Sequence, residues 1–144
     1  MKAYKFLSCA RIEHALDILH NRRLHCADWR RLNDPMEGLY TYSSSLERAV
    51  VERIVKGIGN AKQGYKVCSL SSTIQSHLLW SHYAGGFDGL AIEVALPEDD
   101  FNIRVVEYRD LYFFLDLDNV RDEHEAAQMI LFSKYEEWEY EREI

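Results

Sequence analysis

The 144-residue sequence is poor in the residues that mark fibrous, cross-linked or unstructured chains. It has only 7 Gly and 2 Pro, which excludes a collagen-like protein, a flexible linker and a disordered segment. Its 3 Cys are odd in number and widely spaced, and none forms the CxxC pair typical of a zinc knuckle. We therefore expect free thiols in a reducing cytoplasm.

The sequence also has no long apolar run and no excess of positive charge. No run approaches the roughly 18 residues of a membrane span, and Glu13 comes too early for a secretory signal. The formal net charge is −7, whereas a general nucleic-acid surface needs a basic patch. We expect a soluble cytoplasmic protein without a membrane or general nucleic-acid partner. The pairs Arg22-Arg23 and Arg30-Arg31 are either solvated or flank an anionic ligand.

The residues present are those of a folded globular protein, with 47% hydrophobic and 28% charged side chains. Their spacing predicts helices at residues 11–20, 45–56 (capped by Ser44 or Ser45 and ended by Gly57-Ile58-Gly59-Asn60), 73–83 (capped by Ser72 or Thr73) and 122–134. Strands are predicted at residues 4–7, 24–27, 65–70, 90–96, 103–108 and along the tail from Tyr135 to Ile144. Helices come early and strands dominate later, which indicates one α+β domain over residues 1–144 with a mixed or antiparallel sheet.

The strand LAIEVAL carries Glu93 in an apolar run. If both faces are buried, the carboxylate needs a partner, such as Arg104 or Lys66, because an unpaired buried charge costs several kcal/mol. If one face is open, Glu93 points to solvent. Neither reading requires a ligand.

Spacing excludes the simplest metal and hydrolase sites. His77 and His82 lie five residues apart and do not share a helix face. No GxSxG element marks a serine nucleophile, and nothing local activates Cys68, which we expect in the core.

The stretch HLLWSHYAGGFDGLAIE combines an aromatic and histidine cluster with a pair of glycines. Such a cluster either packs a core or lines a ligand cleft. We predict that Leu78, Leu79 and Trp80 pack inward. We expect His82 and Tyr83, close to the glycines, to face a ligand.

The tail carries Glu141 and Glu143 at i, i+2, which would place both carboxylates on one face of a strand. The ordinary interpretation is a charged chain end. The alternative is a carboxylate pair lining a cleft, where one orients a ribose hydroxyl and the other stabilises positive charge.

Several segments, in order, resemble the bacterial domain of unknown function 2971 family. They are YKF, ILHNRRL, LNDPMEG, VCSLS, LLWSHYAGGFDGLAIEV, VVEY and SKYEEWEYEREI. Members of that family usually continue beyond the E-x-E element with a basic residue and further strand. This sequence stops at Ile144, which indicates a short member or a truncated chain.

The order of elements also resembles that of some ADP-ribosyltransferases. In those proteins an early strand, a helix, a strand with Ser-x-Ser, an aromatic-rich helix and a late E-x-E strand follow one another. The resemblance implies an ADP-ribosyltransferase-like fold and NAD as a substrate. The implied nucleotide-binding residues are Tyr4, Lys5, Arg22, Arg23, Ser69, Ser71, Trp80, His82 and Tyr83.

The same resemblance implies the roles of individual residues. Glu143 would stabilise the oxocarbenium charge that develops when the nicotinamide–ribose bond breaks, and Glu141 would assist the acceptor. A hydroxyl of Ser69 or Ser71 would hold the glutamate or the ribose. Trp80 or Tyr83 would stack on nicotinamide, while Lys5, Arg22 or Arg23 would meet the pyrophosphate.

Two functions are compatible with these residues. One is an NAD-consuming transferase that acts as a toxin or in defence against phage. The other is a binding module without turnover, in which the aromatic cluster packs the core and the acidic surface recognises a nucleotide or a protein.

Overall fold

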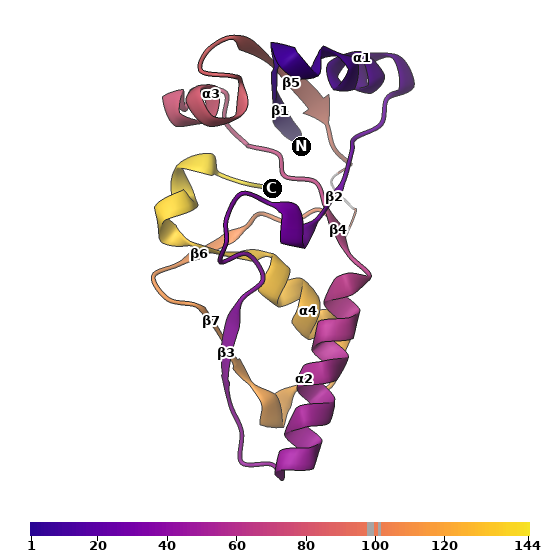
Figure 1. The fold of residues 1–144 in the computed structure, drawn as a ribbon, viewed down its shortest axis with the longest axis vertical. Coiled ribbons are helices and arrows are strands. Elements are labelled where there is room, and N and C mark those ends of the chain that lie inside the picture. Colours follow the sequence, from indigo (N-terminus) through magenta and orange to yellow (C-terminus); the bar gives the residue numbers. More distant parts are fainter. Residues whose placement is uncertain (98–99, 101) are drawn as a thin grey trace. The chain divides into compact units, whose positions relative to one another are not determined.

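The protein, represented by a computed structural model, has an α+β fold with small antiparallel and parallel sheets (Figure 1). The structure describes residues 1–97, 100 and 102–144. The chain divides into two compact units. Unit 1 comprises Met1–Cys26, Cys68–Val106 and Glu137–Ile144, and unit 2 comprises Ala27–Val67 and Glu107–Glu136. That residues 1–144 act as one domain stays a prediction.

Helices and strands alternate irregularly along the chain. The helices are α1 (Ile12–Asn21), α2 (Arg48–Gln63), α3 (His77–Tyr83) and α4 (Glu123–Leu131). The strands are β1 (Lys2–Ser8), β2 (Ala27–Asp28), β3 (Tyr40–Ser43), β4 (Lys66–Val67), β5 (Gly89–Ala95), β6 (Glu107–Arg109), β7 (Phe113–Asp116) and β8 (Ser133–Tyr135). Short 3₁₀ turns cover Cys9–Arg11, Trp29–Arg31, Leu117–Asn119 and Glu136–Glu141. None of the helices in the described residues is long and apolar enough to cross a membrane.

Unit 1 is built on the antiparallel pair β1–β5, in which Lys2 lies opposite Ala95 and Ser8 opposite Gly89. The other side of β1 is joined by a single antiparallel bridge from Tyr4 to Ser71. A second bridge joins Ser71 to Glu143, so the end of the chain lies next to the segment around Ser71.

Helices α1 and α3 cover opposite faces of the β1–β5 pair. They contact alternate residues of β1, since successive strand residues point to opposite sides. Phe6 packs with Leu79 of α3. The next residue, Leu7, packs instead with Ala15 of α1 and with Ile92. Unit 1 therefore has apolar clusters on both sides of its strands.

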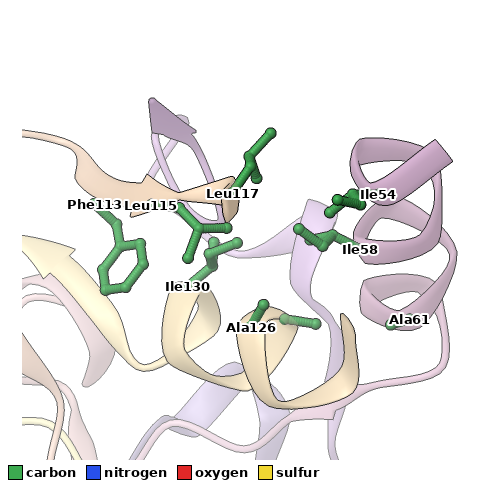
Figure 2. Close-up of a cluster of buried hydrophobic side chains, with 9 residues drawn as sticks. Ile54, Ile58, Ala61, Phe113, Leu115, Leu117, Ala126 and Ile130 are labelled. Atoms are coloured by element: carbon green, nitrogen blue, oxygen red, sulfur yellow. The ribbon is translucent and has the colours of Figure 1, made fainter. Parts of the chain in front are cut away.

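Unit 2 has a core formed by α2, α4 and β7 (Figure 2). Ile58 and Ile130 are fully buried there, at 0% exposure each. Strand β7 alternates buried and exposed residues, and its buried residues Phe113 and Leu115 belong to the same cluster. Strand β7 pairs in parallel with β3.

Lys62 of α2 lies inside unit 2 with only 7% of its surface exposed. Its ammonium donates a 2.6 Å hydrogen bond to the carbonyl of Gly38. It lies 4.5 Å from the centroid of the Trp29 ring and 5.4 Å from that of Tyr40. Burial lowers the pKa of this ammonium. Through its bond to Gly38, Lys62 thus anchors the LNDPMEG segment. Within that segment, Asp34 accepts a 2.8 Å hydrogen bond from the Met36 amide.

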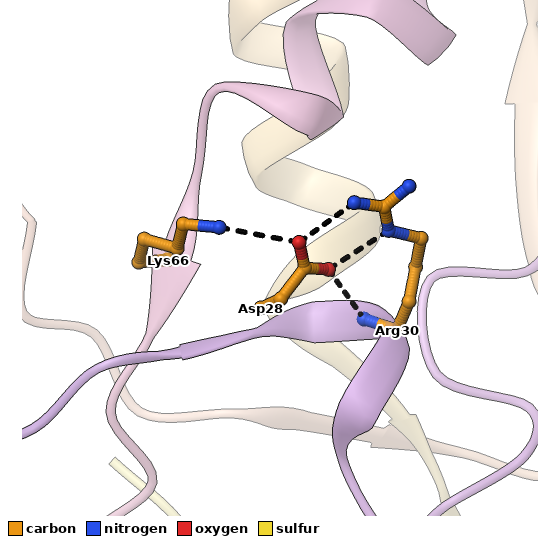
Figure 3. A network of polar contacts seen from close by, with 3 residues as sticks. All are labelled: Asp28, Arg30 and Lys66. Atoms are coloured by element: carbon orange, nitrogen blue, oxygen red, sulfur yellow. Dashed lines mark hydrogen bonds and ion pairs between the residues drawn. The ribbon is translucent and has the colours of Figure 1, made fainter.

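The short pair β2–β4 is held by one charged cluster (Figure 3). The carboxylate of Asp28 binds the guanidinium of Arg30 at 2.7 Å and the ammonium of Lys66 at 3.2 Å. It also accepts a 3.1 Å hydrogen bond from the Arg30 amide. Because Asp28 and Lys66 lie opposite each other in the ladder, the ion pair stabilises this register.

Asp28→Asn is expected to lower the melting temperature at pH 7, with a difference that shrinks as the pH is lowered to 2. Hydrogen bonds from the Arg30 side chain, then from its backbone, and from Lys66 hold the pKa of Asp28 well below its ordinary 3.8. A carboxyl whose pKa is depressed in the folded state stabilises the fold fully at a pH above its unfolded-state pKa. This stabilisation decreases as the pH falls below about 4, toward the folded-state pKa. Melting both proteins from pH 7 to pH 2 tests this. A difference in melting temperature that stays constant with pH would contradict this role of Asp28. The control is Glu52→Gln, which removes the carboxylate of the exposed ion pair between Arg48 and Glu52.

Three predicted elements of unit 1 are confirmed. Residues 4–7 lie within β1, residues 90–95 lie within β5, and the helix predicted at residues 11–20 is α1. In unit 2, the helix expected at residues 122–134 is α4, which Asp122 caps by accepting a 2.8 Å hydrogen bond from the His124 amide. This helix ends at Leu131, and Ser133 and Lys134 belong to β8 instead.

The prediction for the second helix was wrong at both ends. Helix α2 begins at Arg48, after Glu47, rather than at a serine cap. Ser44 and Ser45 instead bind the carboxylate of Asp118, with a Ser44 distance of 2.7 Å. Hydrogen bonding to a distant carboxylate thus replaced the expected local cap.

Helix α2 also continues through the glycine-containing stretch that was expected to end it. A helical glycine costs about 1 kcal/mol relative to alanine, but Ile58 and Ala61 lie in the unit 2 core. A Cβ at Gly57 would lie only 2.9 Å from Cγ of Glu123, so this glycine allows α4 to approach. Tertiary packing therefore outweighs the local helix-ending signal.

The third predicted helix begins later than expected. Helix α3 starts at His77 and is capped by Ser76, whose hydroxyl accepts from the Leu79 amide. Ser72 is no cap, because its hydroxyl donates to the carbonyl of Arg142 at 3.1 Å.

The remaining strand predictions were too long, and the sheet is divided. β2, β4 and β6 cover only parts of the predicted strands at residues 24–27, 65–70 and 103–108. The tail forms β8 and then a 3₁₀ turn, not a strand continuing from Tyr135 to Ile144. Instead of one sheet, the described residues form four two-stranded pairs, two antiparallel and two parallel, with additional single bridges in unit 1.

Candidate functional site

A buried polar cluster in unit 1 surrounds Glu141, which is only 5% exposed. The phenol of Tyr83 donates a short hydrogen bond to the Glu141 carboxylate. The hydroxyl of Ser71 donates to the Glu141 carbonyl at 2.6 Å, and it accepts from the Thr73 amide at 3.1 Å. These bonds join a side chain of α3 and the segment after Ser69 to the end of the chain.

Backbone hydrogen bonds place three segments that are distant in sequence side by side. Tyr4 and Ser71 exchange amide-to-carbonyl bonds of 2.8 and 3.0 Å. Leu70 and Ile144 exchange bonds of 3.2 and 2.9 Å. Glu143, which precedes Ile144, is bridged to Ser71 and is only 6% exposed. The ladder therefore fixes Glu143 relative to the first strand.

The path of the tail explains how both glutamates become buried. Glu141 ends the 3₁₀ turn Glu136–Glu141, and Arg142 follows with a left-handed φ of 44°. The Arg142 amide donates to the carbonyl of Glu139 at 3.1 Å. The prediction that Glu141 and Glu143 lie on one regular strand was therefore wrong, since a left-handed residue separates them.

Aromatic side chains lie next to this carboxylate cluster. The Nδ1 atom of His82 lies 3.1 Å from the Tyr140 hydroxyl, and the two rings meet edge to face at 5.9 Å. The ring of Trp138 lies 6.1 Å from that of Tyr140. His82 is exposed, whereas Tyr140 and Trp138 are partly buried. We refer to His82, Trp138 and Tyr140 as the aromatic rim.

Tyr140 and Trp138 were missed as site residues in the sequence. The available signal was the aromatic content of the tail segment YEEWEY, which immediately precedes Glu141. Because that segment was read as a strand, its aromatic residues were assigned to the sheet and not to the cluster around Glu141.

The aromatic residues of α3 lie partly in the core and partly at the candidate site. Trp80 packs edge-on against Phe6, with ring centroids 5.2 Å apart, and its indole N–H donates to the Ile74 carbonyl at 2.8 Å. Leu79 is buried as predicted, but Leu78 is 47% exposed, so the prediction that Leu78 packs inward was wrong. Trp80 thus supports the helix that presents Tyr83 to Glu141.

The glycines after α3 allow the chain to turn into β5. Gly85 and Gly86 have φ values of 63° and 70°, which side-chain-bearing residues rarely adopt. A Cβ at Gly85 would lie 2.8 Å from the Ser8 hydroxyl, and one at Gly89 would lie 2.4 Å from the Leu7 carbonyl. The close return of the chain fixes α3 against β1.

The arginines predicted for the pyrophosphate lie away from the carboxylate cluster. Arg22 follows the end of α1, and Arg23 pairs with Asp17 at 2.8 Å. Helix α1 covers the opposite face of β1–β5 from α3, so the structure does not bring these arginines to the aromatic rim. Lys5 alternates with Tyr4 on β1, and its ammonium donates to the Ser69 carbonyl at 2.8 Å.

Glu93 is exposed and has local partners. It binds the Lys2 ammonium at 2.7 Å and accepts a 3.1 Å hydrogen bond from the Tyr4 hydroxyl. The Lys2 hydrogen bond, followed by that of Tyr4, lowers the pKa of the Glu93 carboxyl. The partner is Lys2 rather than Arg104 or Lys66, and the open-face interpretation of β5 is confirmed.

Unit 2 contains a shallow pocket with about 290 Å³ of empty space, open solvent included. Arg109 lies 4.9 Å from the Phe113 ring centroid, and its buried Nε atom has no hydrogen-bond partner in the described structure. The pocket is lined by Met36, Leu39, Arg109, Leu111, Tyr112, Phe113, Ser133, Lys134 and Tyr135. Among the residues that the structure describes, this hollow is a second surface at which ligand binding can be compared.

The described residues hold no group of three His, Cys, Asp or Glu side chains arranged to bind a metal ion. The cluster around Glu141 and the aromatic rim offer carboxylate, phenol, hydroxyl and imidazole groups for chemistry. Compared with known proteins, the chain matches no family model, no curated protein and no solved structure.

Proposed function

We propose that unit 1 is an ADP-ribosyltransferase-like catalytic unit that cleaves NAD at the bond between nicotinamide and ribose. The observation that supports this most is the side-by-side arrangement of Tyr4, Ser71 and Glu143, together with the bond from Tyr83 to Glu141. The first strand, the Ser-x-Ser segment, the aromatic helix and the E-x-E element are the parts that the resemblance to such transferases requires in one place.

The chemistry uses the two carboxylates in different roles. When the C–N bond breaks, nicotinamide leaves with the bonding electron pair, and positive charge develops on the ribose C1′ and ring oxygen. The carboxylate of Glu143 stabilises that charge. The acceptor then forms a bond to C1′ and loses its proton to Glu141, which Tyr83 orients.

The aromatic rim supplies surfaces for the flat parts of the nucleotide. Stacking of a base or nicotinamide on an aromatic ring contributes about 1–3 kcal/mol per ring. His82 is the exposed member of the rim, and its ring contacts Tyr140, the residue before Glu141. The pyrophosphate lacks an assigned cation in this proposal, because Arg22 and Arg23 lie at the end of α1 and the Lys5 ammonium is bonded to the Ser69 carbonyl.

The second candidate is a nucleotide- or protein-binding module without turnover. Its supporting observation is the burial of Glu141 and Glu143, since a carboxylate that stabilises a substrate cation must contact the substrate. In this alternative both glutamates hold the tail against Ser71. The transferase requires the rim to open and expose at least Glu143.

Turnover of NAD separates the two candidates. The proposed enzyme is expected to release nicotinamide from NAD, with water as the acceptor if no protein substrate is present, and NAD or ADP-ribose is expected to raise its melting temperature. Chromatographic detection of nicotinamide and a thermal-shift series measure both. A thermal shift without nicotinamide release supports the binding module. If the protein shows no thermal shift and releases no nicotinamide, a nucleotide function is contradicted.

A further inference from the structure

Two cysteines occupy opposing positions beside the β2–β4 ladder. In that antiparallel pair, Ala27 lies opposite Val67 and Asp28 opposite Lys66. The next opposing positions in the same register are Cys26 and Cys68. Residues directly opposite in an antiparallel pair have Cα atoms about 4.5–5.5 Å apart, which falls within the Cα separations of about 4.4–6.8 Å found in disulfides.

The two thiols interact in the reduced protein, in agreement with their opposing positions. Both cysteines are free, with Cys26 exposed and Cys68 partly buried. Burial raises the pKa of the Cys68 thiol, the nearby Lys5 ammonium opposes this, and a side-chain hydrogen bond with Cys26 adds to the increase. The interaction between the side chains therefore agrees with the register of the ladder.

We propose that Cys26 and Cys68 are a redox modification site that forms a reversible intramolecular disulfide on exposure to a hydroperoxide. The ion pair between Asp28 and Lys66 supports the geometry, because it stabilises the register that places the cysteines opposite each other (Figure 3). Nothing in the proposed NAD chemistry uses either thiol, so this site is independent of that function.

The reaction proceeds in two balanced steps. The Cys26 thiolate, which is accessible to solvent, attacks the hydroperoxide, breaks the O–O bond and becomes a sulfenic acid while an alkoxide or hydroxide leaves and is protonated. The Cys68 sulfur then attacks the Cys26 sulfur and displaces water, with the Cys68 thiol proton transferred to the leaving hydroxide. Two thiols are oxidised, one hydroperoxide is reduced, and a small thiol reverses the reaction by exchange.

Cys9 provides a matched internal control. It is also a free, exposed cysteine of unit 1, but it lies in the 3₁₀ turn after β1 and not in the β2–β4 ladder. A general sensitivity of exposed thiols to peroxide would modify Cys9 as well as Cys26. Selective pairing of Cys26 with Cys68 would leave Cys9 free.

The test is thiol counting and disulfide mapping of the full chain after treatment with hydrogen peroxide. We expect a loss of two of the three titratable thiols, a peptide linking Cys26 to Cys68, and recovery of both thiols with dithiothreitol. Cys9→Ser should still lose two thiols, while Cys26→Ser and Cys68→Ser should form no intramolecular disulfide. Disulfide mapping on the chain without substitutions decides the result even if a serine variant fails to fold.

Melting of the oxidised chain gives a second readout. A cross-link between residues 26 and 68 restricts the unfolded chain, so the melting temperature should rise by on the order of 10 °C. A chain that keeps all three thiols, that links Cys9 to either partner or that forms only intermolecular disulfides would overturn the proposal. So would a mapped disulfide that lowers the melting temperature, because the folded geometry would then not accommodate the bond.

Discussion

Replacing Glu143 with Gln is expected to lower the rate of nicotinamide release by on the order of 10²–10³-fold, the usual effect of removing one electrostatic stabiliser of a transition state. Glutamine has nearly the same shape but carries no negative charge to stabilise the oxocarbenium ion. The bridge between Glu143 and Ser71 uses backbone atoms, so it is retained by the variant. Single-turnover measurements of nicotinamide release give the rate of the chemical step directly.

Glu139→Gln is the matched control for this variant. Glu139 belongs to the same tail, carries the same carboxylate and is exposed. Its substitution should leave the rate within about twofold, since surface changes away from the cluster usually have small effects. Equal losses in both variants, or a loss in Glu143→Gln that follows unfolding in circular dichroism, would contradict a specific role for Glu143.

Ile58→Ala is expected to lower the free energy of unfolding by about 2–5 kcal/mol, the range for removing a large buried aliphatic side chain. Ile58 is 0% exposed and lies with Ile54, Ile130 and Leu117 in the unit 2 core (Figure 2). The truncation loses the transfer free energy of the methyl and methylene groups and leaves a cavity between α2 and α4. Urea unfolding followed by circular dichroism measures the difference.

The control for Ile58 is the same substitution at an exposed isoleucine. Ile12 is 46% exposed in α1, so Ile12→Ala should cost less than about 1 kcal/mol. If Ile58→Ala and Ile12→Ala destabilise equally, the assignment of Ile58 to the centre of the unit 2 core would be wrong.

Hydrophobic periodicity predicted the elements whose packing follows local pattern. The near-continuous apolar run 90–96 became β5, and the helical spacing of residues 11–20 became α1. The α+β class follows from the same pattern. The parallel pairs β3–β7 and β6–β8 could not be predicted, because each joins segments far apart in sequence and each strand is four residues or shorter.

The candidate site was predictable in its residue types but not in its geometry. Spacing and resemblance selected Ser71, Tyr83 and Glu141, which the structure joins by hydrogen bonds. The same reasoning grouped Arg22 and Arg23 with them, although α1 lies on the other face of the strands. Sequence order gives no information about the face of a sheet on which a following helix packs.

The route of the tail was the other feature that the sequence did not reveal. Arg142 adopts a left-handed conformation, which residues with a side chain seldom do, and nothing in the segment YEREI marks it. Because of that single residue, Glu141 and Glu143 are not neighbours on one strand face: Glu141 is the buried last residue of a 3₁₀ turn, and Glu143 forms a bridge.

The most direct test of the central claim is to locate the nucleotide by nuclear magnetic resonance. Titration of ¹⁵N-labelled protein with ADP-ribose is expected to shift the amide signals of Ser71, Tyr83, Tyr140 and Glu143 more than those of unit 2. The Glu139→Gln variant should show the same pattern. Shifts confined to the pocket around Arg109 would contradict the proposed site, and so would an unchanged spectrum at millimolar ADP-ribose.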